Sequence, residues 1–163
     1  MKLKQIKIKS KHLMKDEKQD KYVDKILEKL THNHYTVVVD TLKSLRENLI
    51  TPNDRIIDRV IDLAFNSLSV YLRVEASATL GKIWKNLNLQ KDAAYEILDL
   101  LREDIEPNKK ISCLIILKNL GYSDERLIQG IADLYEKETN EEVKDAMYWT
   151  LKYLFDLNKP LKK

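Results

Sequence analysis

The sequence is poor in residues that break regular structure, with three glycines and three prolines among 163 residues. An all-β sandwich or barrel needs a turn about every 8–12 residues, usually built on Gly, Pro, Asn or Asp. Six breakers are too few for that many turns. Gly81, Gly121 and Gly130 also stand far apart, so the sequence contains no glycine-rich phosphate-binding loop. These absences favour a helical protein.

Long apolar runs and cysteine pairs are also missing. No stretch approaches 18 consecutive apolar residues, so we expect no membrane insertion. The N-terminal residues lack the apolar core and cleavage site of a secretory signal. Cys113 is the single cysteine, which excludes an internal disulfide and a Cys-x-x-Cys metal site. The sequence therefore predicts a cytoplasmic protein, in a reducing compartment.

The net charge of +3 is distributed unevenly along the chain. Residues 1–15 contain six lysines and no acid, and residues 159–163 contain three lysines, so the remaining residues carry a net charge of −6. We predict a basic, partly disordered arm over 1–17 and a basic tail over 158–163. Such an arm could bind nucleic acid or a membrane surface. Alternatively, it only increases solubility.

Apolar residues recur at helical spacing from residue 18 onwards. The segment 52–68 is typical, because its apolar residues form one broad stripe of a 3.6-residue period. Thr51 is its expected N-cap and Pro52 its expected first helical residue. The predicted helices cover residues 18–31, 35–48, 52–68, 70–86, 90–104, 107–120, 123–138 and 140–157.

Other helix ends carry their own signals. Gly121 can end one helix in the left-handed conformation, and Ser123 can cap the next. Pro107 and Asn140 mark two further starts. The connections are one to three residues long, which is typical of antiparallel neighbouring helices.

The helices repeat in pairs. Leu42, Leu80, Leu117 and Leu151 are 38, 37 and 34 residues apart and align as one column. Four further columns, at offsets of +3, −4, −20 and −16 from these leucines, are also apolar in every row. Their members are Leu45, Ile83, Leu120, Leu154; Val38, Ala76, Cys113, Met147; Tyr22, Val60, Ile97, Ile131; and Ile26, Ala64, Leu101, Tyr135.

These columns predict stacked helical hairpins. One hairpin cannot bury both of its apolar stripes, whereas stacked neighbours build a continuous core. We expect four hairpins within a repeat domain over residues 18–157, and Cys113 as a small core residue at a helix contact. The predicted hairpins cover residues 18–48, 52–86, 90–120 and 123–157.

One of the repeats resembles a known family. The residues Leu72-Arg73, Ala76, Leu80-Gly81 and Ile83 resemble the second-helix signature of HEAT repeats, V-R-x-x-A-x-x-x-L-G-x-I, and residues 143–154 are a weaker copy. The resemblance implies an all-α fold, an α-solenoid of about four HEAT-like hairpins with right-handed stacking. It also implies that the second helix of each hairpin lines a concave face.

Seven positions before the reference leucines lies a column with three cations. In HEAT-like solenoids such a column lies along the inner face. This implies either a basic stripe that binds phosphates or an acidic peptide, or a polar ladder between repeats that fixes the stacking register. Lys82, Lys109 and Lys152 would widen the basic stripe. Exposed aromatic residues could add stacking contacts to the stripe. The predicted partner-binding set is Tyr35, Tyr71, Arg73, Lys110, Lys144, Tyr148 and Trp149.

Little in the sequence indicates catalysis. His32 and His34 could supply two metal ligands, but they fall in a connection without a cysteine nearby, so solvated imidazoles are the alternative. Cys113 falls on a core column, where a thiol is inert. Carboxylates cluster at helix ends that we expect to be exposed. We therefore predict a non-enzymatic protein with no cofactor and no metal.

Two functional hypotheses follow. In the first, the protein is an interaction module that binds an acidic or amphipathic protein segment on its concave face. In the second, it binds nucleic acid with the lysine-rich arm and the basic stripe. Aromatic residues also crowd residues 148–155, which suggests a homodimer, or a partner, at the C-terminal hairpin.

Overall fold

The computed structural model describes residues 17–159, and this part of the chain is all α-helical. The predicted basic arm, apart from Glu17, and residues 160–163 of the predicted tail lie outside it. The helices are α1 (Glu17–Leu30), α2 (Tyr35–Arg46), α3 (Asp54–Asn66), α4 (Val70–Asn86), α5 (Gln90–Arg102), α6 (Pro107–Leu120), α7 (Glu125–Tyr135) and α8 (Glu141–Asn158).

Several predicted helix boundaries are confirmed. Helix α6 begins at Pro107 and is followed by Gly121 in the left-handed conformation, with φ of 64°. Asn140 caps α8, since its side chain accepts a hydrogen bond from the backbone N–H of Val143. These ends agree with the sequence because each carries one strong local signal.

Two predicted caps are wrong. Helix α3 is capped by Asn53, not Thr51, and the Asn53 side chain accepts from the Ile56 N–H at 3.0 Å. Helix α7 is capped by Asp124, while the Ser123 hydroxyl donates to the Leu154 carbonyl at 2.9 Å. In both cases two neighbouring residues can cap a helix, and tertiary contacts select between them.

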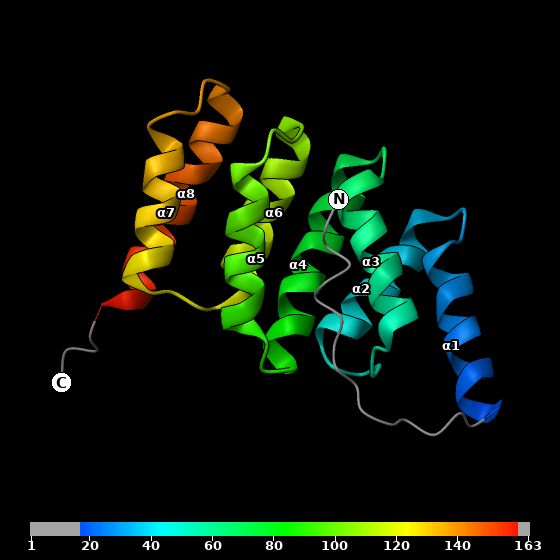
Figure 1. The fold of residues 1–163 in the computed structure, drawn as a ribbon. Helices are drawn as coiled ribbons and strands as arrows, with labels where there is room; N and C mark the ends of the chain where they lie inside the picture. Colours follow the sequence, from blue (N-terminus) through cyan, green and yellow to red (C-terminus); the bar gives the residue numbers. More distant parts are fainter. Residues whose placement is uncertain (1–16, 160–163) are drawn as a thin grey trace.

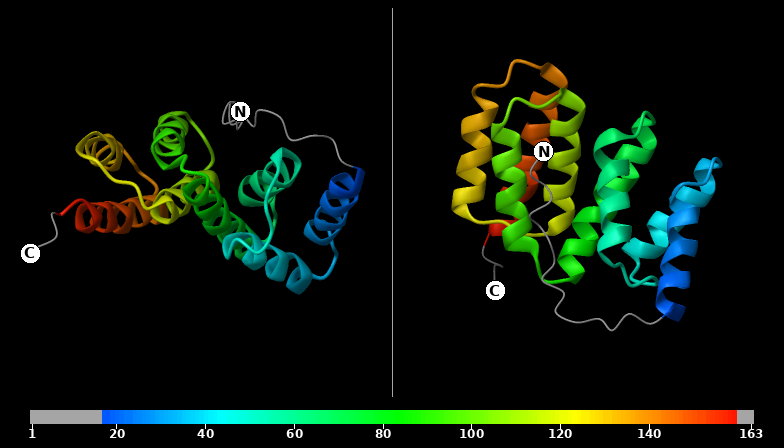
Figure 2. Two further views of the ribbon diagram at one scale, coloured as in Figure 1. Left: turned by 90° about the horizontal axis from the view of Figure 1, so that it is seen from below. Right: turned by 45° about the vertical axis from the view of Figure 1, so that its right-hand side comes forward.

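The helices form two layers (Figures 1 and 2). Helices α2, α4, α6 and α8 contact one another in that order and form the second-helix layer. Helices α1, α3, α5 and α7 form the first-helix layer, and each packs on the second helix of its own pair. The two layers enclose one continuous hydrophobic core that runs from α1 to α8.

The first-helix layer is divided into two pairs. Helix α1 packs on α3, and α5 packs on α7. Helix α3 packs on α4 and also reaches α6, where the Ser112 hydroxyl donates to the Ala64 carbonyl at 2.7 Å. The second-helix layer is therefore the part of the fold that connects the two halves.

The residues of the predicted apolar columns are buried or partly buried, with one exception in α1. Leu42, Leu80 and Leu117 are fully buried, and Leu151 is partly buried. In α1, however, Tyr22 is exposed and Val23 is buried in its place. Helix α1 packs against α2 and α3, and Val23 is the residue buried there. The column that was predicted to contain Tyr22 therefore contains Val23 in α1.

Two glycines mark close contacts between helices. A Cβ on Gly81 of α4 would lie 2.7 Å from the Asn119 Cβ and 2.7 Å from the Ile116 carbonyl oxygen of α6. A Cβ on Gly130 of α7 would lie 2.7 Å from a methyl group of Leu98 on α5. Each glycine therefore lets two neighbouring helices approach closely.

Candidate interaction surface

The solvent-exposed side of the second-helix layer is the candidate surface. Helices α4 and α6 each contact a second helix on either side and first helices behind, so their exposed mid-helix side chains lie on the one remaining side. We call this side, with the equivalent positions of α8, the second-helix face. Its exposed and half-buried residues include Val74, Ala78, Lys82, Ile111, Ile115, Lys118, Trp149 and Lys152.

The predicted aromatic residues form two separate pairs. Tyr35 of α2 and Tyr71 of α4 meet edge to face, with ring centroids 6.1 Å apart. Tyr148 and Trp149 of α8 do the same, with centroids 5.4 Å apart. All four rings are exposed. The structure thus places the predicted aromatic residues at two places along the second helices.

The predicted cation Arg73 is engaged within the protein. Its guanidinium donates to the carbonyl of Ser67, the C-cap of α3, at 2.8 Å. A cation at this position satisfies a free carbonyl at the end of the helix and complements the helix dipole. Arg73 therefore stabilises the connection between α3 and α4.

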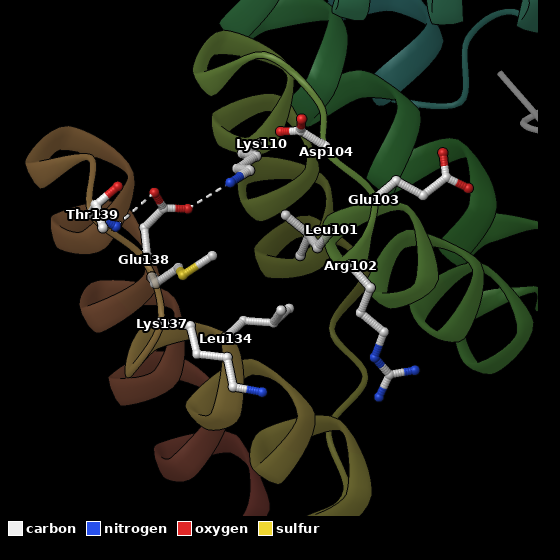
Figure 3. Close-up of a pocket in the computed structure, with 10 residues that line it drawn as sticks. Leu101, Arg102, Glu103, Asp104, Lys110, Leu134, Lys137, Glu138 and Thr139 are labelled. Atoms are coloured by element: carbon white, nitrogen blue, oxygen red, sulfur yellow. Dashed lines mark hydrogen bonds and ion pairs between the residues drawn. The ribbon is translucent and has the colours of Figure 1, made fainter.

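The predicted cation Lys110 is also paired internally (Figure 3). Its ammonium group lies 2.7 Å from the Glu138 carboxylate, which also accepts from the backbone N–H groups of Thr139 and Asn140. Burial alone would raise the pKa of Glu138, but these hydrogen bonds outweigh it and hold that pKa below its ordinary value. The pair ties α6 to the α7–α8 connection.

The remaining contacts of the predicted cation column are similar. Lys144 lies over the Tyr135 ring, 5.2 Å from its centroid. Two positions after Arg73, Glu75 of α4 pairs with Arg46 of α2. Among the column cations, only Lys110 contacts the neighbouring hairpin, whereas Arg73 and Lys144 make contacts within their own hairpins.

A polar groove surrounds the Lys110–Glu138 pair (Figure 3). It has a volume of about 290 Å³ and lies between the α5–α6 and α7–α8 connections. Its lining combines three basic and three acidic side chains, so it offers no net charge to a ligand. The charged residues are Arg102, Glu103, Asp104, Lys110, Lys137 and Glu138.

Charge is divided between the two layers. The second helices carry ten Lys and Arg residues against six Asp and Glu residues, and the basic excess lies on α2, α4 and α6, because α8 is net acidic. The first helices carry nine Lys and Arg residues against twelve Asp and Glu residues. The second-helix face therefore attracts acidic groups, and the first-helix layer repels them.

A hydrogen-bond network around Asp124 was not predicted from the sequence. The hydroxyls of Tyr95 and Tyr122 each donate to one Asp124 oxygen at 2.6 Å, and Arg126 lies over the Tyr95 ring. Burial would raise the pKa of Asp124, but the two tyrosine hydrogen bonds and the Leu127 N–H lower it. The network anchors the α6–α7 connection on α5.

Lys43 and Lys118 of the second helices fall outside the predicted basic stripe, whereas Lys82 and Lys152 were expected to widen it. A signal for the missed lysines exists, because Lys43, Lys118 and Lys152 each directly follow a reference leucine. In α4 this position is Gly81, and Lys82 comes one residue later.

The residues considered for chemistry have simple surroundings. The His32 and His34 rings stack 5.3 Å apart, and the His32 Nδ1 accepts from the His34 N–H. Within residues 17–159 no group of three potential ligands could hold a metal ion. Cys113 is buried, and this burial raises the pKa of its thiol.

The described helices are too short or too polar to cross a membrane. Comparisons of the chain with protein-family models, with curated proteins and with solved structures find no match.

Proposed function

We propose that the protein is a small α-solenoid of four HEAT-like hairpins that binds another protein along its second-helix face. The order of helix contacts supports this architecture, since α2, α4, α6 and α8 pack in sequence with one first helix behind each. Such stacking offers a preformed surface, which reduces the entropy lost on binding. A cytoplasmic location is part of the proposal, supported by the single buried Cys113.

One observation carries the proposal: apolar and basic side chains lie together on the second-helix face. Val74, Ile111, Ile115 and Trp149 are exposed or half-buried there, although the same helices bury apolar residues on their other sides. Exposed apolar side chains beside charged ones are typical of sites for protein segments. The partner we propose is an acidic or amphipathic segment.

Photo-crosslinking from the two layers tests this function. A photoreactive amino acid replaces Ile115 or Val74 on the second-helix face, or Asp99 or Asp58 on the first-helix layer, in the native cell. We expect a defined protein adduct from the first two positions and none from the other two. Equal adducts from both layers, or none from the second-helix face, would contradict the proposal.

The excess of basic residues on α2, α4 and α6, with six lysines in residues 1–15, favours nucleic-acid binding as a second candidate. Each phosphate contact should contribute about 0.9 to the slope of log K against log salt on duplex DNA. Titration of duplex and single-stranded oligonucleotides at low salt separates the candidates. Aliphatic residues such as Ile111 and Ile115 favour the protein partner, because they offer no ring on which a base can stack.

A homodimer through the C-terminal hairpin stays a prediction. Tyr148 on α8 is 51% exposed, whereas Leu114, at the equivalent position of α6, is buried. A Tyr148→Glu and Phe155→Glu double variant should be monomeric if this face joins two copies. Light scattering of both proteins at equal concentration measures the change, and an unchanged mass would remove the prediction.

A further inference from the structure

The second-helix face carries a row of lysines that is distinct from the predicted cation column. Lys82, Lys118 and Lys152 lie in the fourth turns of α4, α6 and α8, and Lys43 lies in the third turn of α2. Among the described residues none of the four forms an ion pair. We call these four residues the lysine row.

The predicted column behaves differently from the lysine row. Arg73, Lys110 and Lys144 engage a helix-end carbonyl, a carboxylate and a tyrosine ring within the protein. Their positive charge is thus already used to hold neighbouring segments together. In the lysine row, Lys152 lies over the exposed Trp149 ring of its own helix, and Lys82 and Lys118 have no ion pair among the described residues. These lysines hold no neighbouring helices together, so their charge can attract an external acidic group.

An apolar row runs beside the lysine row. Ala78, Ile115 and Trp149 lie three or four residues earlier on the same helices, which places them one turn away on the same side. On α8 the contact is direct, since the Lys152 ammonium lies 5.0 Å from the centroid of the Trp149 ring. Gly81 of α4 lies close to Asn119 of α6. Their sequence neighbours Lys82 and Lys118 therefore lie at a similar height on the two helices.

We infer that the partner is an amphipathic helical segment with aliphatic residues on one edge and Asp or Glu residues on the adjacent edge. Its aliphatic edge covers the apolar row, and its carboxylates face the lysine row. Neighbouring helices pack about 8–10 Å apart, so a helix of about 18 residues, roughly 27 Å long, crosses α4, α6 and α8. This inference rests on the proposed function and specifies the chemistry of its partner.

Designed peptides test both edges of the partner. The probe is a synthetic, fluorescently labelled helical peptide of about 18 residues, with Leu on one edge and Glu on the adjacent edge. One control peptide replaces Glu with Gln, and a second replaces Leu with Ala. In anisotropy titrations of the full-length chain, we expect each control peptide to bind at least ten-fold more weakly than the probe.

Charge reversal tests the lysine row itself. The Lys82→Glu and Lys118→Glu double variant should bind the probe at least ten-fold more weakly. A matched control, Lys25→Glu with Lys137→Glu, changes the net charge equally at exposed positions outside the second-helix face, and it should bind within two-fold of the original. Far-ultraviolet circular dichroism and thermal melts establish that both variants are folded.

Three results would overturn the inference. They are unchanged binding of the probe to the lysine-row variant, equal binding of the Gln control peptide, and displacement of the probe by a duplex oligonucleotide that binds more tightly. The same variant in the crosslinking experiment separates the two claims. If an adduct from Ile115 persists in the lysine-row variant, the partner chemistry is wrong and the proposed function stands. If the probe behaves as expected but Ile115 gives no adduct, the proposed function fails instead.

Discussion

The two helix layers differ in how many sides of each helix are buried. Helices α3 and α7 of the first-helix layer have one apolar side and one charged side. Helices α4 and α6 carry apolar residues nearly all round, because each is enclosed by two second helices and by first helices behind. In the inner hairpins the first helix is thus amphipathic and covers one side of the core, whereas the second helix is mostly buried.

The comparison also explains where binding can occur. A second helix has only one side left for solvent, so apolar residues that remain there, such as Ile115, are few and closely spaced. The first-helix layer has a wider but acidic exposed side. The layer whose central helices are enclosed on most sides is thus also the layer with the mixed apolar and basic surface.

The largest effect is expected from a charge in the second-helix layer. Leu80→Asp or Leu117→Asp places a carboxylate at a fully buried position in the shared core, and either should unfold the protein. Circular dichroism and thermal melting measure the loss of helix. Leu68→Asp is the matched control, because Leu68 is 99% exposed and the same change there should leave the melt nearly unaltered. Native helicity in Leu80→Asp would show that the layer assignment is wrong.

A smaller effect comes from adding one methyl group in each layer. In Gly81→Ala the new Cβ meets the backbone carbonyl of Ile116, which cannot move alone, so the variant should lose about 1–3 kcal/mol of unfolding free energy. In Gly130→Ala the new Cβ meets the flexible end of Leu98, and the better helix propensity of Ala, about 1 kcal/mol, offsets the contact. Urea unfolding of both variants measures the difference. Equal losses of unfolding free energy in the two variants would contradict the conclusion that α4 packs more closely on α6 than α7 packs on α5.

The Lys110–Glu138 pair should make stability depend on acidity. The pKa of Glu138 is lowered in the folded protein, so its contribution is complete above its unfolded pKa, about 4.3, and is lost as the pH falls through the folded pKa. Glu138→Gln should cost about 1–2 kcal/mol at pH 7. Urea unfolding at several pH values should show the difference from the original protein narrowing below about pH 4. A difference that is constant with pH would exclude the proposed charge effect.

The smallest predicted effect separates the two candidate caps of α3. Asn53→Ala removes the acceptor for the Ile56 N–H and should cost about 1 kcal/mol. Thr51→Ala removes no helix cap and should stay within about 0.5 kcal/mol of the original. Denaturant midpoints for the two variants provide the comparison. A larger loss from Thr51→Ala would restore the cap expected from the sequence.

Much of the fold could be predicted because helix signals are local. The spacing of apolar residues and the signals at Pro107, Gly121 and Asn140 place helices close to where the structure has them. The N-cap residue could not be predicted where two residues able to cap a helix stand close together. This is the case for Thr51 and Asn53 before α3, and for Ser123 and Asp124 before α7. The buried residue of α1 was predicted one position too early, because periodicity alone does not distinguish Tyr22 from its neighbour Val23.

The candidate surface was less predictable than the fold. The sequence indicated which cations lie on the second helices, but not which of them have partners inside the protein. Lys110 is paired through Glu138, a residue 28 positions away that no helical period connects to it. The lysine row could only be distinguished from this column once the internal contacts were known.

The two tryptophans provide the most direct test of the second-helix face. Trp84 is fully buried, whereas Trp149 is 56% exposed and belongs to the apolar row. Nuclear magnetic resonance resolves their two indole N–H signals during titration with the acidic amphipathic peptide. We predict that the Trp149 signal shifts with the amide signals of Ile115 and Lys118, while the Trp84 signal stays in place. A shift confined to amides of the first-helix layer would contradict it.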